Sequence, residues 1–496
     1  MRSLLLVLTA GLVLALVPPP AAHAEPTAFD TGRADAYLAK ALRDTGLPGL
    51  SAVVTRGREV VHAAGYGHDS EGNPVTADTP MRVASVSKSF TALAVMTLVE
   101  AGRIALDEPV ARRLPGFTMA DPRYERVTVR HLLNQTSGFS DTTIDVESLS
   151  GSSSLAEYVA GLAGESLAAD PGTRYRYCNA NYEVAARLVE VASGQGFADY
   201  LRSAVFGPLG MEHSGVTEAE VRPADGYVSL FGAWLPRAEL PGFRDSSGSG
   251  GVLTTAADMG RWLTSQTGDG VRLVSEDGLR TLRTSSPVAD YAMGWAPDEE
   301  LDVFVHSGNL FTYTAVQAID PDTGYGFAVL ANSAALQDDT YAVLAGLVAI
   351  SRGREPGEVG GGRQVFELVL GLIALGAVAL GVLGVRRAGT WARRRAGTPT
   401  WRAAVRCVPA LLPAVVLAAF PDLLSVLIGG RAVTWAQLTY FPLPLTVTAV
   451  VAAAAGVLVV AARAVRLRSS RWTGPARWTG PAKWTGPAGR PSARPA

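Results

Sequence analysis

The sequence predicts an exported domain containing both helices and strands, followed by about three membrane-spanning helices. The first observation is charge: residues 25–363 contain 27 Lys and Arg against 43 Asp and Glu, a net of −16, whereas residues 364–496 contain 16 against 2, a net of +14. The second is a set of long apolar runs at both ends of the chain, and the third is the mixture of strand and helix patterns between them. A chain of 496 residues with such a charge split is expected to hold two or more units in different surroundings.

The N-terminus has the pattern of a signal peptide. Met1-Arg2 precedes the apolar run Leu4–Val17, and prolines then lead to Ala22-His23-Ala24. A charged start, an apolar core of this length and a small-residue cleavage site are typical of export signals. A retained membrane helix is the alternative, but it would need a longer run. We therefore expect cleavage after Ala24.

Three apolar stretches near the C-terminus, residues 365–385, 407–430 and 440–462, are each about long enough to cross a bilayer. Arginines cluster after the first stretch and after the third, whereas the turn between the second and third holds only Arg431. The positive-inside rule then places the acidic domain outside the cell membrane and the C-terminus in the cytoplasm. A soluble helical bundle is the alternative, but these runs lack a polar face.

The chain therefore divides into consecutive units: a signal peptide (1–24), an extracytoplasmic domain (25–355), a linker (356–364), three membrane spans and a basic cytoplasmic tail (463–496). The tail contains three hexapeptides of the form (R/K)WTGPA, at residues 471–476, 477–482 and 483–488. A cationic tail that carries tryptophans is expected to lie against anionic lipid.

Composition excludes several classes of function. The acidic domain has no basic stripe for phosphates, so we expect no nucleic-acid partner. Two cysteines, Cys178 and Cys407, cannot build a disulfide framework or a cysteine-rich metal site. No Gly-x-Ser-x-Gly, His-Glu-x-x-His or Cys-x-x-Cys is present, so we expect neither a metal nor a cofactor. The partners expected are the membrane and a small-molecule or peptide substrate.

Local patterns predict the elements of the exported domain. A helix is expected around residues 34–44, followed by a hairpin, and a long helix begins near Ser85 and ends before Gly102. A loop passes into an amphipathic helix that ends near Gly194. The expected strands are Leu50–Val54 and Val60–Ala64 in the hairpin, and Val303–Gly308, Tyr313–Ile319 and Tyr325–Asn332 towards the end of the domain, with Asn309 just past the first of these three.

Lys88 stands out because the chain has only two other lysines, Lys40 and Lys483. It follows Ser85 by three residues in a helix that is apolar on nearly every side, so both side chains lie on one face of its first turn. One interpretation is a capping serine beside a lysine whose head reaches solvent or forms a salt bridge. The other is a nucleophile with its amine partner, because burial favours a neutral lysine that accepts the serine proton.

Two further motifs follow in order, at separations of about 90 and 130 residues. Tyr177 and Asn179 form Tyr-x-Asn where the loop enters its helix, a pattern that by itself fits a packed tyrosine and a capping asparagine. His306-Ser307-Gly308 then ends a predicted strand. Between Tyr177 and Asn179, Cys178 is expected to be a small buried filler. His131, among apolar neighbours, is expected to be structural and not a catalytic base.

The three motifs in this order resemble those of the penicillin-recognising serine hydrolases, in the branch that holds class C β-lactamases, D-alanyl-D-alanine carboxypeptidases and esterases. The resemblance covers about residues 30–350 and includes residues 127–138, 206–211 and 250–258. It implies an α/β fold of the β-lactamase/transpeptidase type. In that fold the N-terminal hairpin and the C-terminal strands form an antiparallel sheet of about five strands. Helices flank the sheet, and the site lies where it meets a mostly helical region.

The resemblance also implies roles for single residues. The implied catalytic set is Ser85 as the acylated nucleophile, Lys88 as its activating amine and Tyr177 as a general base or acid. The implied substrate-binding set is Asn179, His306, Ser307 and Gly308, and the backbone N–H groups of Ser85 and Asn309 would form an oxyanion hole.

His306 departs from the Lys-Thr-Gly motif of class C β-lactamases, and the change favours a carboxypeptidase. We expect His306 either to carry charge at mildly acid pH, which would improve hydrolysis of carboxylate-bearing substrates towards pH 6, or to donate a hydrogen bond when neutral. The leading hypothesis is an exported, membrane-anchored hydrolase of D-amino-acid peptides or related amides and esters. A β-lactamase or carboxylesterase on the same residues is the alternative. A silent sensor of cell-wall fragments is less well supported, since a binding module needs no nucleophile.

Overall fold

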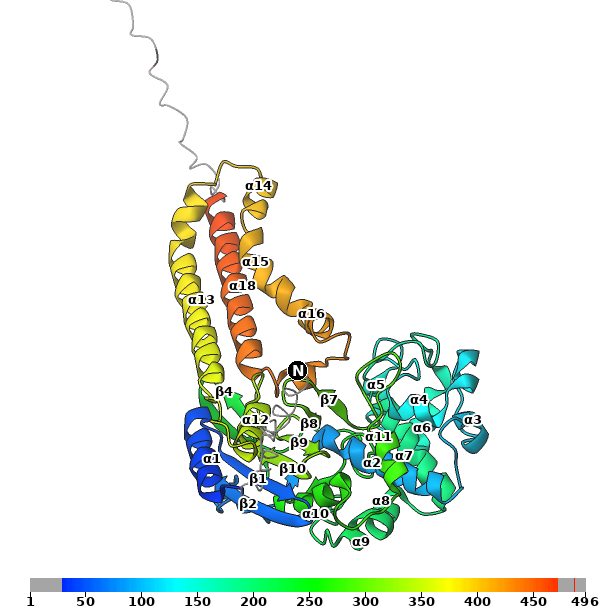
Figure 1. The fold of residues 1–496 in the computed structure, drawn as a ribbon. Helices are drawn as coiled ribbons and strands as arrows, with labels where there is room; N and C mark the ends of the chain where they lie inside the picture. Colours follow the sequence, from blue (N-terminus) through cyan, green and yellow to red (C-terminus); the bar gives the residue numbers. More distant parts are fainter. Residues whose placement is uncertain (1–28, 472–485, 487–496) are drawn as a thin grey trace, which may run out of the picture.

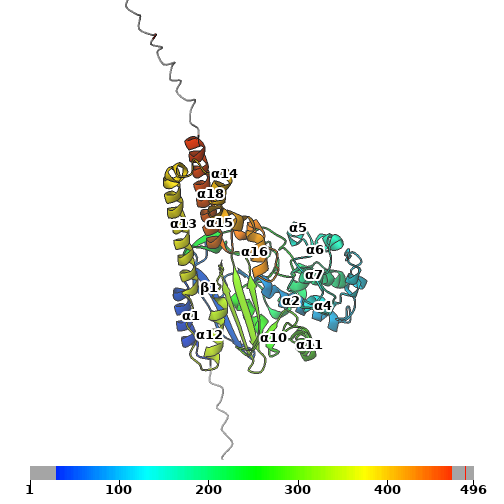
Figure 2. The ribbon, with the colours of Figure 1, turned by 90° about the horizontal axis from the view of Figure 1, so that it is seen from above.

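The computed structural model describes residues 29–471 and Gly486 (Figure 1). The signal peptide expected at residues 1–24 lies outside the described residues, as do the tail repeats after Arg471, apart from Gly486. A sheet with helices on its faces stands beside a mostly helical region, and long apolar helices project from one end of this body (Figures 1 and 2).

The main sheet has six antiparallel strands in the order β2-β1-β10-β9-β8-β7. The N-terminal hairpin pairs with the last long strand, with Leu50 opposite Ala331, and this closes the sheet between the two ends of the domain. The antiparallel α/β architecture predicted from the sequence is thereby confirmed, with one short edge strand beyond the five or so expected. The strands are β1 (Gly49–Arg56), β2 (Glu59–Gly67), β7 (Ala296–Asp298), β8 (Val303–Asn309), β9 (Thr314–Asp320) and β10 (Tyr325–Ala331).

Helices cover both faces of this sheet. Helices α1 (Thr31–Thr45) and α12 (Thr340–Ser351) pack on one face, where Leu38 and Leu347 are fully buried. Helix α10 (Ala256–Thr267) packs on the other face. Because both faces are covered, β9 and β10 are buried at every position, as expected for strands that read as continuous apolar runs.

Helix α2 (Ser87–Glu100) lies between the sheet and the helical region and is buried along most of its length, as its apolar sequence predicts. Phe90 stacks on Trp262 of α10 with ring centroids 3.8 Å apart. Gln317 of β9 donates to Ser89 Oγ (2.8 Å) and accepts from the Trp262 indole N–H (2.9 Å). These contacts fix the start of α2 against the sheet.

The remaining elements of the domain form the helical region and two small sheets. The helices and helical turns are η1 (Ala84–Val86), α3 (Val110–Arg113), η2 (Pro122–Arg126), α4 (Val129–Leu133), α5 (Val146–Leu149), α6 (Leu155–Ala160), η3 (Gly161–Gly164), α7 (Ala180–Ser193), α8 (Phe197–Leu201), η4 (Arg202–Phe206), α9 (Gly207–Leu209) and α11 (Glu276–Leu282). The small sheets are β11-β4-β5, formed by Ser333–Ala334, Gly226–Leu230 and Ala233–Arg237, and β3-β6, formed by Met81–Arg82 and Leu253–Thr254.

Apolar helices follow the domain. By length and composition, α13 (Gly362–Arg393) and α18 (Leu443–Arg471) are each able to cross a membrane. Helices α15 (Val408–Ala418) and α16 (Phe420–Leu427) make a third span only if they count as one, because they are bent by 63° at their junction. The short α14 (Thr400–Val405) and α17 (Trp435–Leu438) lie in the connections.

The first turn of α13 is packed against the domain. Arg363 is 3% exposed, donates to Ser229 Oγ (2.8 Å) and to the Thr45 carbonyl (3.2 Å), and lies over the Trp234 ring. Glu367, one turn later, accepts the Gly232 N–H at 2.6 Å. Figure 1 shows α13, α15 and α18 side by side, with the connection after α16 returning to the domain. The apolar helices are therefore placed at a defined position on the domain.

Candidate active site

Ser85 lies in a constrained turn between β3 and α2. The residue before it, Ala84, has φ +49°, a left-handed conformation that a residue with a Cβ rarely adopts. The next turn is tied to the loop leading into β6, because Ser87 Oγ donates to the Ala84 carbonyl (2.6 Å) and accepts the Val252 N–H (3.0 Å). Ser85 is half-buried at the junction of sheet and helical region, whereas the sequence suggested a helix beginning at Ser85 itself.

Lys88 is fully buried, and its amine faces Ser85. Its Nζ donates to Ser85 Oγ (3.1 Å), Asn179 Oδ1 (3.0 Å) and the Ser249 carbonyl (2.8 Å). Burial, and after it the positive charge of Arg431, lower the pKa of Lys88 to about 7, against the opposing effect of Glu183. The lysine therefore does not reach solvent, and the first interpretation of the Ser-x-x-Lys pattern is wrong for its lysine.

The Tyr177–Asn179 segment brings two more predicted residues to this point. Asn179 precedes α7, but its side chain makes no capping bond and instead accepts from Lys88, so the capping interpretation is wrong. Burial raises the pKa of Tyr177 to about 12, although a hydrogen bond with Ser85 acts in the opposite direction. The Lys88 amine lies 4.8 Å from the centre of the Tyr177 ring.

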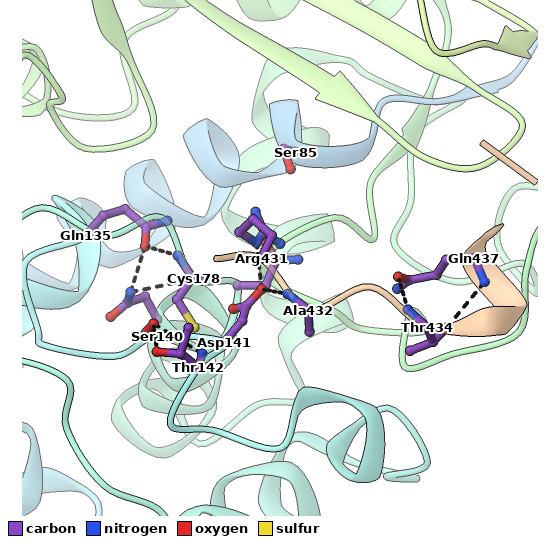
Figure 3. Close-up of polar contacts among 12 residues, drawn as sticks. Ser85, Gln135, Ser140, Asp141, Thr142, Cys178, Arg431, Ala432, Thr434 and Gln437 are labelled. Atoms are coloured by element: carbon purple, nitrogen blue, oxygen red, sulfur yellow. Dashed lines mark hydrogen bonds and ion pairs between the residues drawn. The ribbon is translucent and has the colours of Figure 1, made fainter. Parts of the chain in front are cut away.

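Gln135 holds this segment in place. It has φ +61°, and its Oε1 accepts the Cys178 N–H (3.0 Å) and the Asn181 amide (2.6 Å), as Figure 3 shows. Cys178 is fully buried, and burial raises its thiol pKa, as expected of a filler and not of a reactive thiolate. His131 is structural, because it forms a reciprocal capping pair with Thr128 at the start of α4.

Strand β8 brings His306, Ser307, Gly308 and Asn309 alongside the Ser85 turn. A Cβ added to Gly308 would lie 2.2 Å from the Val83 carbonyl oxygen and 3.0 Å from the Ser85 backbone nitrogen, so only glycine fits this approach. The end of β8 and the backbone of Ser85 are thus adjacent, where the predicted oxyanion hole would lie.

His306 is buried, and both ring nitrogens have partners. Nε2 lies 3.0 Å from the Tyr291 hydroxyl, and Nδ1 lies 2.8 Å from the Ser307 carbonyl. Burial, together with the Lys88 charge, lowers the pKa of His306 to about 3. The expectation that His306 gains charge towards pH 6 is therefore corrected: the ring stays neutral, and the hydrogen-bonding alternative is the one that the structure favours.

Sequence reasoning missed two groups that complete the site. Glu183, buried in α7, accepts from Ser247 Oγ (2.7 Å) and the Gly248 N–H (2.9 Å), and so shapes the turn whose Ser249 carbonyl holds Lys88. Arg431 reaches the site from the connection between α16 and α17, with its guanidinium 5.0 Å from the centre of the Tyr177 ring. Glu183 lies on a helix that the sequence predicts to be amphipathic, so its burial could not be read from the pattern, and nothing local marked Arg431.

The site brings together the Ser85 hydroxyl, the Lys88 amine, which can be neutral near pH 7, and the Tyr177 phenol, with backbone N–H groups beside them. Such a set can move a proton from the hydroxyl to the amine and supply a proton from the phenol. The same groups are therefore able to support acyl transfer through a covalent intermediate.

Comparisons with known proteins identify the family of the chain. A family model described as Beta-lactamase matches residues 34–349. Protein flp of Staphylococcus aureus (strain COL) is 28% identical over 311 residues, 60% of this chain and 62% of that protein. Penicillin-binding protein 4 of Amycolatopsis lactamdurans is 37% identical over 238 residues, 45% of this chain and 59% of that protein. The chain thus matches less than two thirds of the length of these relatives.

Solved structures share the fold. The octameric penicillin-binding protein homologue from Pyrococcus abyssi superposes with a TM-score of 0.56 at 26% identity, covering 70% of this chain and 81% of that chain. The D-amino acid amidase from Ochrobactrum anthropi SV3 superposes with a TM-score of 0.54 at 24% identity, covering 65% of this chain and 96% of that chain, which shows the fold alone. With the match over residues 34–349, these findings establish that the chain belongs to the beta-lactamase family of serine hydrolases.

Proposed function

We propose that this protein is an exported, membrane-anchored serine hydrolase that forms an acyl-enzyme on Ser85 and acts on D-amino-acid peptides or related amides and esters. The observation that carries the proposal is the Lys88 amine, fully buried and 3.1 Å from Ser85 Oγ. A base with a pKa of about 7 is suited to activating a hydroxyl near neutral pH.

In the proposed reaction, Ser85 Oγ attacks the substrate carbonyl carbon while its proton passes to the neutral Lys88 amine. The bond between that carbon and the leaving nitrogen or oxygen breaks, and the leaving atom takes a proton. Water then attacks the resulting ester, which releases the carboxylic acid and restores the Ser85 hydroxyl. The backbone N–H groups of Ser85 and Asn309 would stabilise the negative charge that develops on the carbonyl oxygen.

The two pKa values support a division of labour between Lys88 and Tyr177. At pH 8 an amine with a pKa of about 7 is mostly neutral, so Lys88 would be the base. A phenol with a pKa of about 12 keeps its proton at that pH, so Tyr177 would donate to the leaving group and then regain a proton from the Lys88 ammonium. Asn179, held by Lys88, would bind the substrate amide, and Ser307 and Gly308 of β8 would line the acyl group.

Two considerations support the choice of substrate. Relatives named as penicillin-binding proteins favour a substrate with the peptide-like geometry that a penicillin shares. A neutral His306 replaces the permanent cation of a dedicated class C β-lactamase. A β-lactamase or carboxylesterase using the same residues is the second candidate. A silent sensor would not need the buried amine facing Ser85.

We also propose that the domain lies outside the cell membrane, with the C-terminus inside. The start of α13 and the connection between α16 and α17 both contact the domain, whereas Figure 1 places α14 at the opposite end of the apolar helices. This arrangement is compatible with three crossings, provided that α15 and α16 together make the second one.

The test is covalent labelling of the full chain in detergent. A fluorophosphonate or a fluorescent penicillin should add its mass to the wild-type protein, and Ser85→Ala should remain unlabelled at the same melting temperature. Intact-mass spectrometry followed by peptide mapping locates the modified residue. Equal labelling of wild type and Ser85→Ala would show that Ser85 is not the nucleophile.

A further inference from the structure

We propose that Arg431, a residue of the membrane region, binds an anionic group of the substrate, so that the active site is completed by the connection between the second and third apolar segments. We name residues 428–434 the cleft loop. The inference rests on the proposed function, because it assigns a substrate feature to that same site.

Asp141 fixes the position of Arg431. Its Nε donates to Asp141 Oδ2 (2.6 Å), and the Ala432 N–H donates to the same oxygen (3.3 Å). The Asp141 side chain is only 3% exposed, whereas the Arg431 side chain is 33% exposed. A buried carboxylate that accepts two bonds from the cleft loop anchors that loop to the domain (Figure 3).

The terminal amino groups of Arg431 remain available for a ligand. Of its three guanidinium nitrogens, only Nε has a hydrogen-bond partner among the described residues. The guanidinium lies over Tyr177, the phenol that contacts Ser85, at 5.0 Å from the ring centre. A group bound to these nitrogens would therefore lie beside the reacting atoms and not at a remote surface.

The cleft in front of Arg431 favours an anion. It has a volume of about 690 Å³, and its charged lining residues are Arg174, Arg176, Arg431 and Asp141. Because Asp141 is paired with Arg431, the lining carries an excess of positive charge. No ion pair or hydrogen bond holds the side chains of Arg174 and Arg176 within residues 29–471. They add attraction at a distance, whereas Arg431 is preorganised and loses little freedom on binding.

The other cations at the site are poorly suited to this role. Lys88 already donates to three oxygens and is fully buried, and His306 is neutral with both nitrogens occupied. An arginine offers a planar pair of donors that matches a carboxylate. The ligand class that fits is therefore a substrate with a carboxylate close to the scissile bond, such as a peptide cleaved near its C-terminus.

The experiment compares a matched pair of substrates on the full chain in detergent. Both are N-acyl-D-alanyl thioesters, one with thioglycolate as the leaving group and the other with its neutral amide, and thiol release reports turnover. Arg431→Gln should lower kcat/KM for the anionic thioester about 10- to 100-fold, chiefly through KM, because a charge-assisted bond is lost. The neutral thioester should change no more than about threefold, and Arg431→Lys should keep part of the preference.

A matched control separates recognition from docking of the membrane region. Arg237 donates to the Thr439 carbonyl (2.5 Å) and lies over the Tyr440 ring, so Arg237→Gln loosens a second contact between the domain and the membrane region, one that does not line the cleft. It should keep the wild-type ratio between the two thioesters. Any change in Lys88 basicity on losing the Arg431 charge affects both thioesters alike and cancels in that ratio.

The outcomes are distinguishable. If Arg431→Gln slows both thioesters by one factor, Arg431 has only an electrostatic or structural role and the inference is overturned. If it accelerates both, the cleft loop blocks the site, which also overturns the inference. A wild-type protein that hydrolyses neither thioester would instead overturn the proposed function.

Discussion

Replacing Gly308 by alanine should slow acylation of Ser85 much more than it destabilises the domain. The added Cβ would stand 2.2 Å from the Val83 carbonyl oxygen and 3.0 Å from the Ser85 nitrogen. Relieving the first contact requires β8 and the Ser85 turn to separate by about 1 Å, and a misplacement of about 1 Å can cost about 100-fold in rate. That factor corresponds to about 2.7 kcal/mol in activation free energy.

The free energy of unfolding should fall by about 1–3 kcal/mol, the usual cost of one extra carbon in a packed site. The assay is the rate of fluorophosphonate labelling of the full chain, followed by gel fluorescence, with a melting curve for each variant. Gly164→Ala is the matched control, because a Cβ at Gly164 meets nothing within 4 Å. If Gly308→Ala were acylated at the wild-type rate with an unchanged melting temperature, the adjacency of β8 and the Ser85 turn would be refuted.

Two further predictions concern protonation and topology. The value of kcat/KM should fall about tenfold per pH unit below about pH 7, because protonation of Lys88 removes the base. His306→Gln should leave this acid-side decline of kcat/KM unchanged between pH 5.5 and 8.5, because His306 is already neutral there. If the decline of kcat/KM shifts to another pH in His306→Gln, the imidazole titrates in that range. A reporter fused at Gly357 should be active outside the cell and one fused after Ala496 inside; an external C-terminus would mean that one of the three proposed spans does not cross, and the bent pair α15–α16 is the weakest of them.

Elements with a strong local pattern could be predicted from the sequence. The hairpin expected at residues 50–54 and 60–64 corresponds to β1 and β2, and the strand expected at Val303–Gly308 corresponds to β8, which extends one residue further, to Asn309. These segments alternate or are apolar throughout, so period and turn residues are sufficient. The insertion of β10 between β1 and β9 has no local pattern, because pairing across the whole chain decides it.

The capping interpretation of Asn179 shows how local preference can mislead at a functional site. Asparagine before a helix normally caps it, yet the Asn179 side chain turns away from α7 towards the buried Lys88 amine. The N–H groups of Asn181 and Tyr182 at the start of α7 already donate to the Cys178 and Asn179 carbonyls (3.3 and 2.9 Å), so the Asn179 side chain is free to accept the third bond of the buried amine. The contact with Lys88 determines the orientation of the Asn179 side chain, and the local sequence does not reveal that contact.

Arg431 illustrates a different limit of prediction. It contacts Asp141 across 290 positions of the chain, so no spacing or periodicity links the two. One feature of the sequence is nonetheless informative in retrospect: arginines cluster at the C-terminal ends of α13 and α18, but only Arg431 lies in the connection between the second and third apolar segments. In the proposed topology this connection lies on the outer side of the membrane, where positive charge is normally depleted, so an arginine there that is paired with a buried carboxylate needs a local reason. A cleft beside Tyr177 with an excess of positive charge is such a reason, and it connects the membrane region to the chemistry of the domain.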